Sequence, residues 1–310
     1  MEFLKLLEVI RTPFLDTVFQ FFTFFGEEMI FMIIAMAFFW CIDKKTGYLL
    51  LYVSFLGNII NTFLKLAFLV PRPWVLDKDF TIVESARAQA TGYSFPSGHT
   101  QNSAGMFFGI AWARKELWIR IVCVAFALLV AFSRMYLGVH TPADVLVSLG
   151  VALLLVAVAY PLLNRAWDNA KWFAPLIALL LAAGAALILY IELVPMPANA
   201  IAQFSLDCYE SGYKMVGGAV GFAVVLWLER KYINFSVKAV WWAQLLKLVL
   251  GLGVVIAVRM LLKTPLLSLF GGHNIGNGIR YFLMVLVGGA IWPLTFKFFG
   301  KLGQKKAQAA

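Results

Sequence analysis

Three short clusters of polar residues lie between residues 65 and 144 of an otherwise apolar sequence. In chain order they contain Lys65 and Arg72, then Ser97, Gly98 and His99, then Arg134, His140 and Asp144. Fixed cations and free backbone N–H groups bind the equatorial oxygens of a phosphoryl group. One histidine can attack phosphorus while another protonates the leaving oxygen. These residue types therefore favour phosphoryl transfer at a single site.

The second and third clusters stand where helices are expected to begin. Ser97 is a good N-cap, and Gly98 lets an anion approach the free N–H groups of a helix N-terminus. Thr141 as N-cap with Asp144 at N3 is a sound helix start, which places His140 one turn from a carboxylate that can orient its ring. The alternative is a plain cap beside an incidental interfacial histidine in each case.

Lys65 and Arg72 are seven residues apart, so a helix would place them on one face. Pro71 and Pro73 are expected to end that helix at the membrane surface. Both side chains can instead snorkel to lipid head groups. Lys65 argues against this alternative because it lies inside an apolar run, where a cation usually faces a polar cavity.

The composition indicates a membrane protein. Hydrophobic residues make up 62% of the 310, charged residues make up 14%, and the mean hydropathy is +0.84. These values predict an all-α polytopic helical bundle. The net charge of +10 is attributed to Lys and Arg in cytoplasmic loops, and we expect no nucleic-acid partner.

Apolar runs divide the chain into nine or ten expected helices. They lie at roughly 27–42, 46–70, 97–113, 117–135, 142–163, 172–194, 210–228, 239–262 and 279–299. Residues 2–24 fit either a kinked span or an interfacial helix. We expect a helical core at residues 1–165 and an additional C-terminal transmembrane region at residues 166–310, with the seam at 164–171.

The charges of the loops predict the orientation. Basic groups occur at residues 43–45, 114–115, 165–171, 230–238 and 297–306, which fall on alternate loops. By the positive-inside rule these loops are cytoplasmic, so the three clusters open on the extracytoplasmic side of a membrane, expected to be the cytoplasmic membrane. A metal site is not expected, because the three cations would repel a divalent ion and no carboxylate cluster is available to hold one. No cofactor is expected, and the sequence specifies no oligomeric state.

The three clusters, read as Lys-x6-Arg-Pro, Pro-Ser-Gly-His and Ser-Arg-x5-His-x3-Asp, resemble the three-part signature of the type-2 phosphatidic acid phosphatase superfamily. The resemblance implies a six-helix core, here followed by about four further transmembrane helices. It also implies metal-independent hydrolysis through a phosphohistidine. By the same resemblance His140 is the nucleophile, Asp144 orients it and His99 is the general acid. The implied phosphate-binding residues are Lys65, Arg72, Ser97, Gly98 and Arg134.

A site between helices near the interface favours an amphiphilic substrate in the bilayer. The resemblance implies phosphatidate, phosphatidylglycerophosphate, sphingoid-base phosphates or polyprenyl diphosphates such as the undecaprenyl carrier. A soluble sugar phosphate is the alternative. Separately, residues 72–77 are similar to the matching loop of glucose-6-phosphatase, a many-spanned member of this superfamily. A lipid phosphotransferase, or a lipid transporter that uses the extra helices and their glycine-rich segments, stays open as well. The loop at residues 77–93 either covers the site or is a solvated connection.

Overall fold

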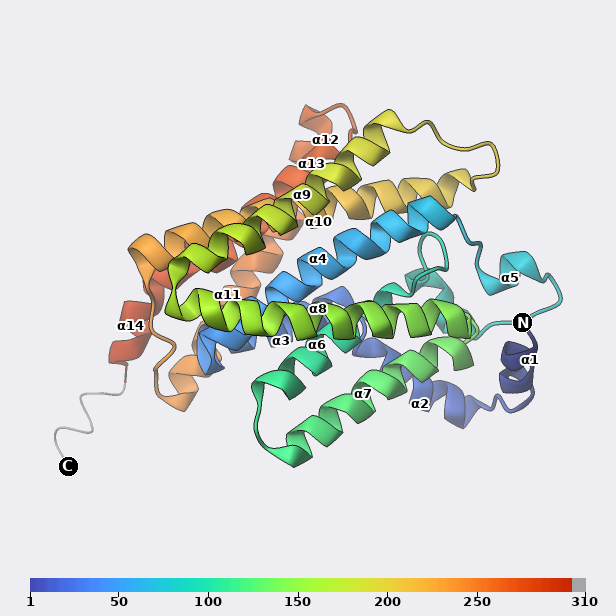
Figure 1. Ribbon diagram of the computed structural model, residues 1–310, viewed down its shortest axis with the longest axis horizontal. Coiled ribbons are helices and arrows are strands. Elements are labelled where there is room, and N and C mark those ends of the chain that lie inside the picture. The colour runs from blue at the N-terminus through green and yellow to red at the C-terminus, as the bar shows by residue number, and fades with distance from the viewer. Residues whose placement is uncertain (303–310) are drawn as a thin grey trace.

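The computed structural model describes residues 1–302, in which the regular elements are all helical (Figure 1). The α-helices are α1 (Glu2–Val9), α2 (Pro13–Phe24), α3 (Glu28–Ala37), α4 (Lys44–Phe68), α5 (Pro73–Leu76), α6 (Gly98–Ala113), α7 (Leu117–Tyr136), α8 (Pro142–Asp168), α9 (Phe173–Leu193), α10 (Ala202–Leu228), α11 (Trp241–Leu261), α12 (Lys263–Leu269), α13 (Ile275–Leu286) and α14 (Phe296–Lys301). Short π-helical turns extend α3, α10 and α13. The predicted all-α polytopic class is confirmed.

The number of helices that can cross a membrane is close to the prediction. Seven helices of the described chain are long and apolar enough, or eight when the bent pair of α2 and α3 is one span. The 16-residue α6 is shorter than these but packs against α4, α7 and α8 within the bundle. With α6 included, the count reaches the lower end of the expected nine or ten.

The N-terminal residues contain both of the structures that their sequence allowed. α1 is a separate short helix whose buried Leu4 and Leu7 pack onto the segment that follows α5. Lys5 forms a salt bridge of 2.9 Å with Asp77 in the same segment. α2 and α3 follow as a pair with a 49° bend between them, and together they are apolar enough for a broken span or a re-entrant loop. The stretch of residues 2–24 therefore divides at residues 10–12 into a short separate helix and the first helix of this bent pair.

α4 is the central helix of the bundle. It contacts α6 and α8 on one side and α9 and α10 on the other, as Figure 1 shows. Apolar residues lie on nearly all of its faces, and such a helix is stable only when it is surrounded. The larger of two hydrophobic clusters has members from both the expected core and the C-terminal region, for example Leu56 and Phe222.

The C-terminal helices α10 and α13 are packed with their backbones in contact. A Cβ built on Gly217 would lie 2.0 Å from the carbonyl oxygen of Gly278, so only glycine fits there. The glycines at 217–221 therefore pack helices together and do not border either of the two cavities described below. The expected seam at residues 164–171 coincides with the end of α8 at Asp168 and the short turn before α9. Residues 303–306 of the last basic group lie outside the described residues.

Candidate active site

Arg72 reaches the site by a route that differs from the predicted one. α4 ends at Phe68, where Leu69 turns the chain with a left-handed φ of 50°. Arg72 then lies outside the helix, as the N-cap of the four-residue α5. The expectation that it shares a helix face with Lys65 is therefore wrong, because the helix stops before Pro71. Both side chains nevertheless line one cavity.

The loop that precedes α6 holds these two cations through its backbone. The Arg72 guanidinium, on a residue that is 2% exposed, donates to the carbonyl oxygens of Thr91 at 2.6 Å and Gly92 at 2.9 Å. The Lys65 ammonium donates to the carbonyl oxygen of Tyr93. Gln89, Thr91 and Gly92 also line the cavity. This end of the loop at residues 77–93 is therefore a wall of the site.

His140 and Asp144 form the pair that the helix start predicted. The capping box of α8 is present: Asp144 Oδ2 accepts from the Thr141 N–H at 2.8 Å, and Thr141 Oγ1 accepts from the Asp144 N–H at 3.4 Å. The same Oδ2 lies 3.3 Å from Nδ1 of His140. This contact places the proton on Nδ1 and leaves a lone pair on Nε2. Arg72 Nη1 lies 2.9 Å from that Nε2, on the side of the cavity.

Ser94 belongs to this pair and was not anticipated. Its hydroxyl donates to Asp144 Oδ2 at 2.5 Å and lies 3.4 Å from His140 Nδ1. A serine in an irregular loop carries no periodic signal, and only the folding of that loop against α8 brings it to the carboxylate. Ser94 thus fixes the Asp144 carboxylate that orients the imidazole.

The charge of His140 follows from its surroundings. Burial, together with the facing Arg72 guanidinium, lowers the pKa of His140 well below the ordinary value for histidine, although Asp144 opposes this. A lowered pKa means that the imidazole stays neutral as the pH falls through the usual titration range. The neutral ring is the form that can attack phosphorus.

We therefore expect His140 to remain neutral at pH 6 in the folded protein. The ring ¹⁵N shifts of selectively labelled protein measure this directly, and variants of the other two histidines assign the signals. Free histidine in the same buffer is the reference for the ordinary pKa of the imidazole, near 6.5. A His140 signal that titrates at or above that value would contradict the arrangement.

The start of α6 is tied to the start of α8. Ser97 caps α6 by accepting from the Thr100 N–H at 3.4 Å, as predicted. Its own N–H donates to the Asp144 carbonyl at 3.1 Å, and its carbonyl accepts from Ser148 Oγ at 2.9 Å. A Cβ on Gly98 would meet nothing within 4 Å, so this glycine faces open space in the cavity. The helix N-terminus is therefore available to an anion, as expected.

Several buried nitrogen atoms around this N-terminus have no partner. His99 Nε2 and the Nε and Nη2 atoms of Arg134 are buried without a hydrogen bond in the described chain, whereas Arg134 Nη1 donates to Thr23 Oγ1 at 2.6 Å. His99 also contacts the bend between α2 and α3, where a Cβ on Gly26 would lie 2.8 Å from the Cβ of His99. Unpaired buried donors are rare in native proteins and call for an explanation. A bound anion beside them would supply it.

The cavity has a volume of about 190 Å³ and is lined by five of the eight predicted residues: Lys65, Arg72, Gly98, His99 and His140. The other three, Ser97, Arg134 and Asp144, are buried against these residues and do not line the cavity. Asp207, Cys208 and Ser211 of α10 complete the wall, which the sequence did not indicate. The N–H of Gly92 also donates to Asp207 Oδ2 at 3.0 Å. The C-terminal region therefore contributes directly to the site.

The chemistry available is that of an anion pocket with two imidazoles. Lys65, Arg72 and the start of α6 at Gly98 line the cavity, with the carboxylates of Glu28 and Asp207 elsewhere in its wall. His140 presents an acceptor nitrogen, and His99 presents an unpaired ring nitrogen. Among residues 1–302, no three His, Cys, Asp or Glu side chains are grouped so as to hold a metal ion. The donor set thus fits a phosphate group, with both histidines at its surface.

Comparison with known families gives two matches. The family described as "PAP2 superfamily" matches residues 46–168, and "PAP2 superfamily phosphatase, transmembrane extension" matches residues 213–306. The first range contains the three polar clusters, and the second contains most of α10 and all of α11 to α13.

Individual relatives match different parts of the chain. Undecaprenyl-diphosphatase BcrC of Bacillus subtilis is 33% identical over 32% of this chain and 48% of its own length. A probable sphingosine-1-phosphate phosphatase of Dictyostelium discoideum is 26% identical over 72% of this chain and 56% of its own. Phosphatidylglycerophosphatase B of Bacillus subtilis is 30% identical over 47% of this chain and 74% of its own. The chain thus spans about half the length of the first two relatives.

Proposed function

Because this chain belongs to the PAP2 superfamily, we propose that it is a metal-independent integral-membrane phosphatase that hydrolyses a lipid phosphate or a polyprenyl diphosphate. The observation that carries this proposal is the convergence of two imidazoles, Lys65 and Arg72 on one cavity at a helix N-terminus. The names of the relatives add support, since all three refer to phosphatases of lipid substrates.

In the first step Nε2 of His140 attacks phosphorus and forms a P–N bond as the P–O bond to the alcohol breaks. His99 takes up a proton as the phosphate anion binds and gives this proton to the leaving oxygen, so the alcohol departs neutral. Asp144 holds Nδ1–H and stabilises the positive charge that develops on the ring. Lys65, Arg72 and the N–H groups of α6 bind the equatorial oxygens, and Arg134, buried behind the cavity wall, adds positive charge close to them.

In the second step water replaces the histidine. His99, now neutral, takes a proton from the water as its oxygen attacks phosphorus, and the P–N bond breaks. The products are inorganic phosphate and free His140, with His99 protonated again. The same phosphohistidine would pass its phosphoryl group to a lipid hydroxyl if one replaced the water, so transfer is the closest alternative reaction.

The positive-inside rule supports an active site on the extracytoplasmic side. The basic residues 43–45 precede α4, residues 114–115 join α6 to α7, and residues 165–171 end α8, all at the end of the core helices opposite to the polar clusters. Figure 1 shows α1 and α5, which flank the site, at one end of the bundle and α14 at the other. The phosphate would therefore be bound at head-group level in the outer leaflet.

A substrate panel in excess EDTA tests the function. We expect the purified protein to release phosphate from phosphatidate or undecaprenyl diphosphate at rates that EDTA changes by less than about twofold, because the cations of the site are side chains. Glucose 6-phosphate should be a far poorer substrate. Turnover that EDTA abolishes and a divalent ion restores would contradict the proposal. Preferential hydrolysis of glucose 6-phosphate would favour the sugar-phosphate alternative, and phosphorylation of an added lipid alcohol would show transfer.

A further inference from the structure

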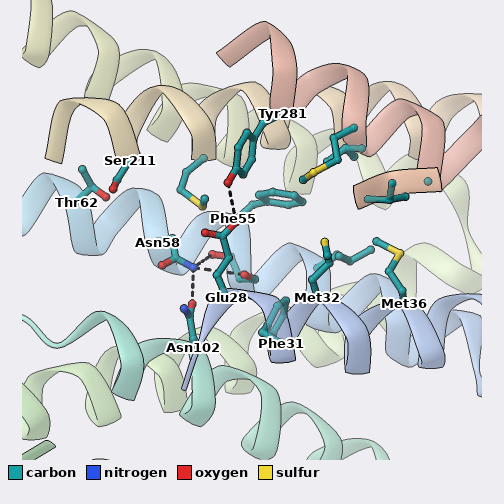
Figure 2. A pocket seen from close by; sticks show the side chains of 17 residues that line it. Glu28, Phe31, Met32, Met36, Phe55, Asn58, Thr62, Asn102, Ser211 and Tyr281 are labelled. Carbon is teal, nitrogen blue, oxygen red and sulfur yellow. Dashed lines mark hydrogen bonds between the residues drawn. The ribbon is translucent and has the colours of Figure 1, made fainter. Parts of the chain in front are cut away.

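The cavity of the candidate active site, lined by Lys65, Arg72 and His140, is called the phosphate cavity below. A second cavity of about 150 Å³ adjoins it inside the bundle (Figure 2). Five residues line both cavities and form the neck between them: Glu28, Asn58, Thr62, Asn102 and Ser211. Beyond this neck the lining changes to Met, Phe, Leu and Val side chains. We call this second space the apolar chamber. It is walled by α3 and α4 from the core and by α10 and α13 from the C-terminal region.

One face of α4 runs the length of both cavities. Its lining residues recur every three or four positions, and in order from the chamber to the phosphate site they are Leu51, Ser54, Phe55, Asn58, Asn61, Thr62 and Lys65. This spacing places them in one stripe of the helix, and residues 51–65 rise about 21 Å along its axis. The stripe is apolar at one end, uncharged and polar in the middle, and cationic at the other end. α10 also changes from apolar to polar along the two cavities, from Met215 through Ser211 to Asp207, but its charged end is a carboxylate.

An amphiphile has this same order of groups. A phosphate at Lys65 and Arg72 would continue through the polar neck into a hydrocarbon chain beside Met32, Met36 and Met215. Methionine side chains adapt to chains of irregular shape. A volume of about 150 Å³ is that of an engineered apolar cavity that holds one benzene ring. The chamber therefore has room for a short segment of one hydrocarbon chain and not for segments of two acyl chains.

Glu28 is the only charged residue among those that line the chamber. It begins α3 directly after the bend between α2 and α3, and its carboxylate accepts a hydrogen bond from Tyr281 Oη at 3.1 Å, as Figure 2 shows. It is exposed and forms no salt bridge among residues 1–302. An intramembrane carboxylate is costly and usually has a cationic partner. Here that partner would lie at the neck, between the phosphate and the chain.

We propose that the apolar chamber binds the hydrocarbon chain of the substrate while Glu28 binds an ammonium group next to the phosphate. The preferred substrate is then a single-chain lipid phosphate with a primary amine near its phosphate-bearing carbon. This inference rests on the proposed phosphatase function and names the substrate class of that site. It also gives the C-terminal region a role, because Met215, Tyr281 and Met284 supply one wall of the chamber.

The first test compares three lipid phosphates in detergent with EDTA present. We expect kcat/KM for sphinganine 1-phosphate to exceed that for a lysophosphatidate of matched chain length by about tenfold, the worth of one charge-assisted hydrogen bond. Two-chain phosphatidate should be poorer still. If none of the three releases phosphate, the phosphatase function itself fails. If they are hydrolysed equally, the phosphatase stands and the inference fails.

Glu28→Gln separates the amine contact from the chamber. The glutamine keeps the shape and can still accept from Tyr281, but it has lost the charge. We expect kcat/KM for sphinganine 1-phosphate to fall about tenfold and that for lysophosphatidate to stay unchanged within about twofold. The matched control is Glu210→Gln, which removes a carboxylate that pairs with Lys214 and lines neither cavity. An equal loss for both lipids, or no loss, would overturn the role of Glu28.

Met32→Trp tests the chamber without touching the phosphate site. The larger ring fills space that a chain would occupy, so we expect at least about a tenfold loss of kcat/KM for the long-chain amine phosphate. A short-chain phosphate, such as 2-aminobutyl phosphate, should be hydrolysed as by the wild type. The control is Met29→Trp, one turn away on α3 and outside both cavities. Equal rates on long and short chains in Met32→Trp would overturn the chamber as the chain site.

Discussion

His140→Ala is expected to reduce phosphate release by at least about 10⁴-fold while the protein remains folded. The substitution removes the nitrogen that forms the P–N bond, and no other described residue in the cavity offers a comparable acceptor beside Arg72. A loss of this size corresponds to about 5.5 kcal/mol of transition-state stabilisation. Because the variant cannot form the intermediate, incubation with ³²P-labelled substrate should also give no acid-labile phosphoprotein, whereas rapid quenching of the wild type should trap it.

His273→Ala is the matched control for that variant. This histidine lies after α12, contacts Tyr213 and lines neither cavity, so its removal should leave turnover within about twofold. Size-exclusion profiles and thermal unfolding of both variants establish that they fold. If His140→Ala turned over substrate at more than about a thousandth of the wild-type rate, His140 could not be the nucleophile.

His99→Ala is expected to have a large effect that depends on the leaving group. An alkoxide must be protonated as it departs, and loss of a general acid costs about 10²- to 10⁴-fold. With p-nitrophenyl phosphate the leaving phenolate is stable without a proton. We therefore expect a loss near 10³-fold on an alkyl lipid phosphate and about tenfold or less on the aryl ester, measured as the kcat of each substrate.

The contrast between the two histidine variants is the decisive comparison. In His140→Ala the kcat should fall by the same factor on both substrates, because the nucleophile is needed whichever group leaves. Gln101→Ala provides a control on the same helix, since Gln101 is buried two residues further along and is not among the residues that line the phosphate cavity. If the kcat of His99→Ala fell by the same factor on the alkyl and aryl esters, His99 would not be the general acid.

The helix starts could be predicted from the sequence because capping is local. Thr141, Asp144 and His140 lie within five consecutive residues, and the capping box that brings them together needs no other part of the chain. The cap by Ser97 and the open approach at Gly98 follow from neighbouring residues in the same way. The class of fold was also predictable, since the cost of unpaired backbone groups in hydrocarbon leaves helices as the main solution for apolar runs of about twenty residues.

Arg72 shows where local reasoning fails. Its spacing from Lys65 suggested a shared helix face, yet Leu69 turns the chain and the guanidinium is held by carbonyl groups of residues 91, 92 and 139. Nothing within a few residues of Arg72 encodes those partners. Ser94 is similar, because its contact with Asp144 exists only once an irregular loop has folded onto α8.

The sequence by itself determined the class of fold, a helical membrane bundle, and its residue types, their order and the helix caps predicted the phosphate site that we propose. Only the tertiary structure decided what surrounds the phosphate. Glu28 comes from a bend between two half-helices, and Ser211 and Tyr281 come from the C-terminal region, 67 and 137 residues beyond Asp144, the last residue of the polar clusters. Such contacts depend on how α4 packs against α10 and how α10 packs against α13. Helix packing sums many small, non-local contacts, so no short motif records them.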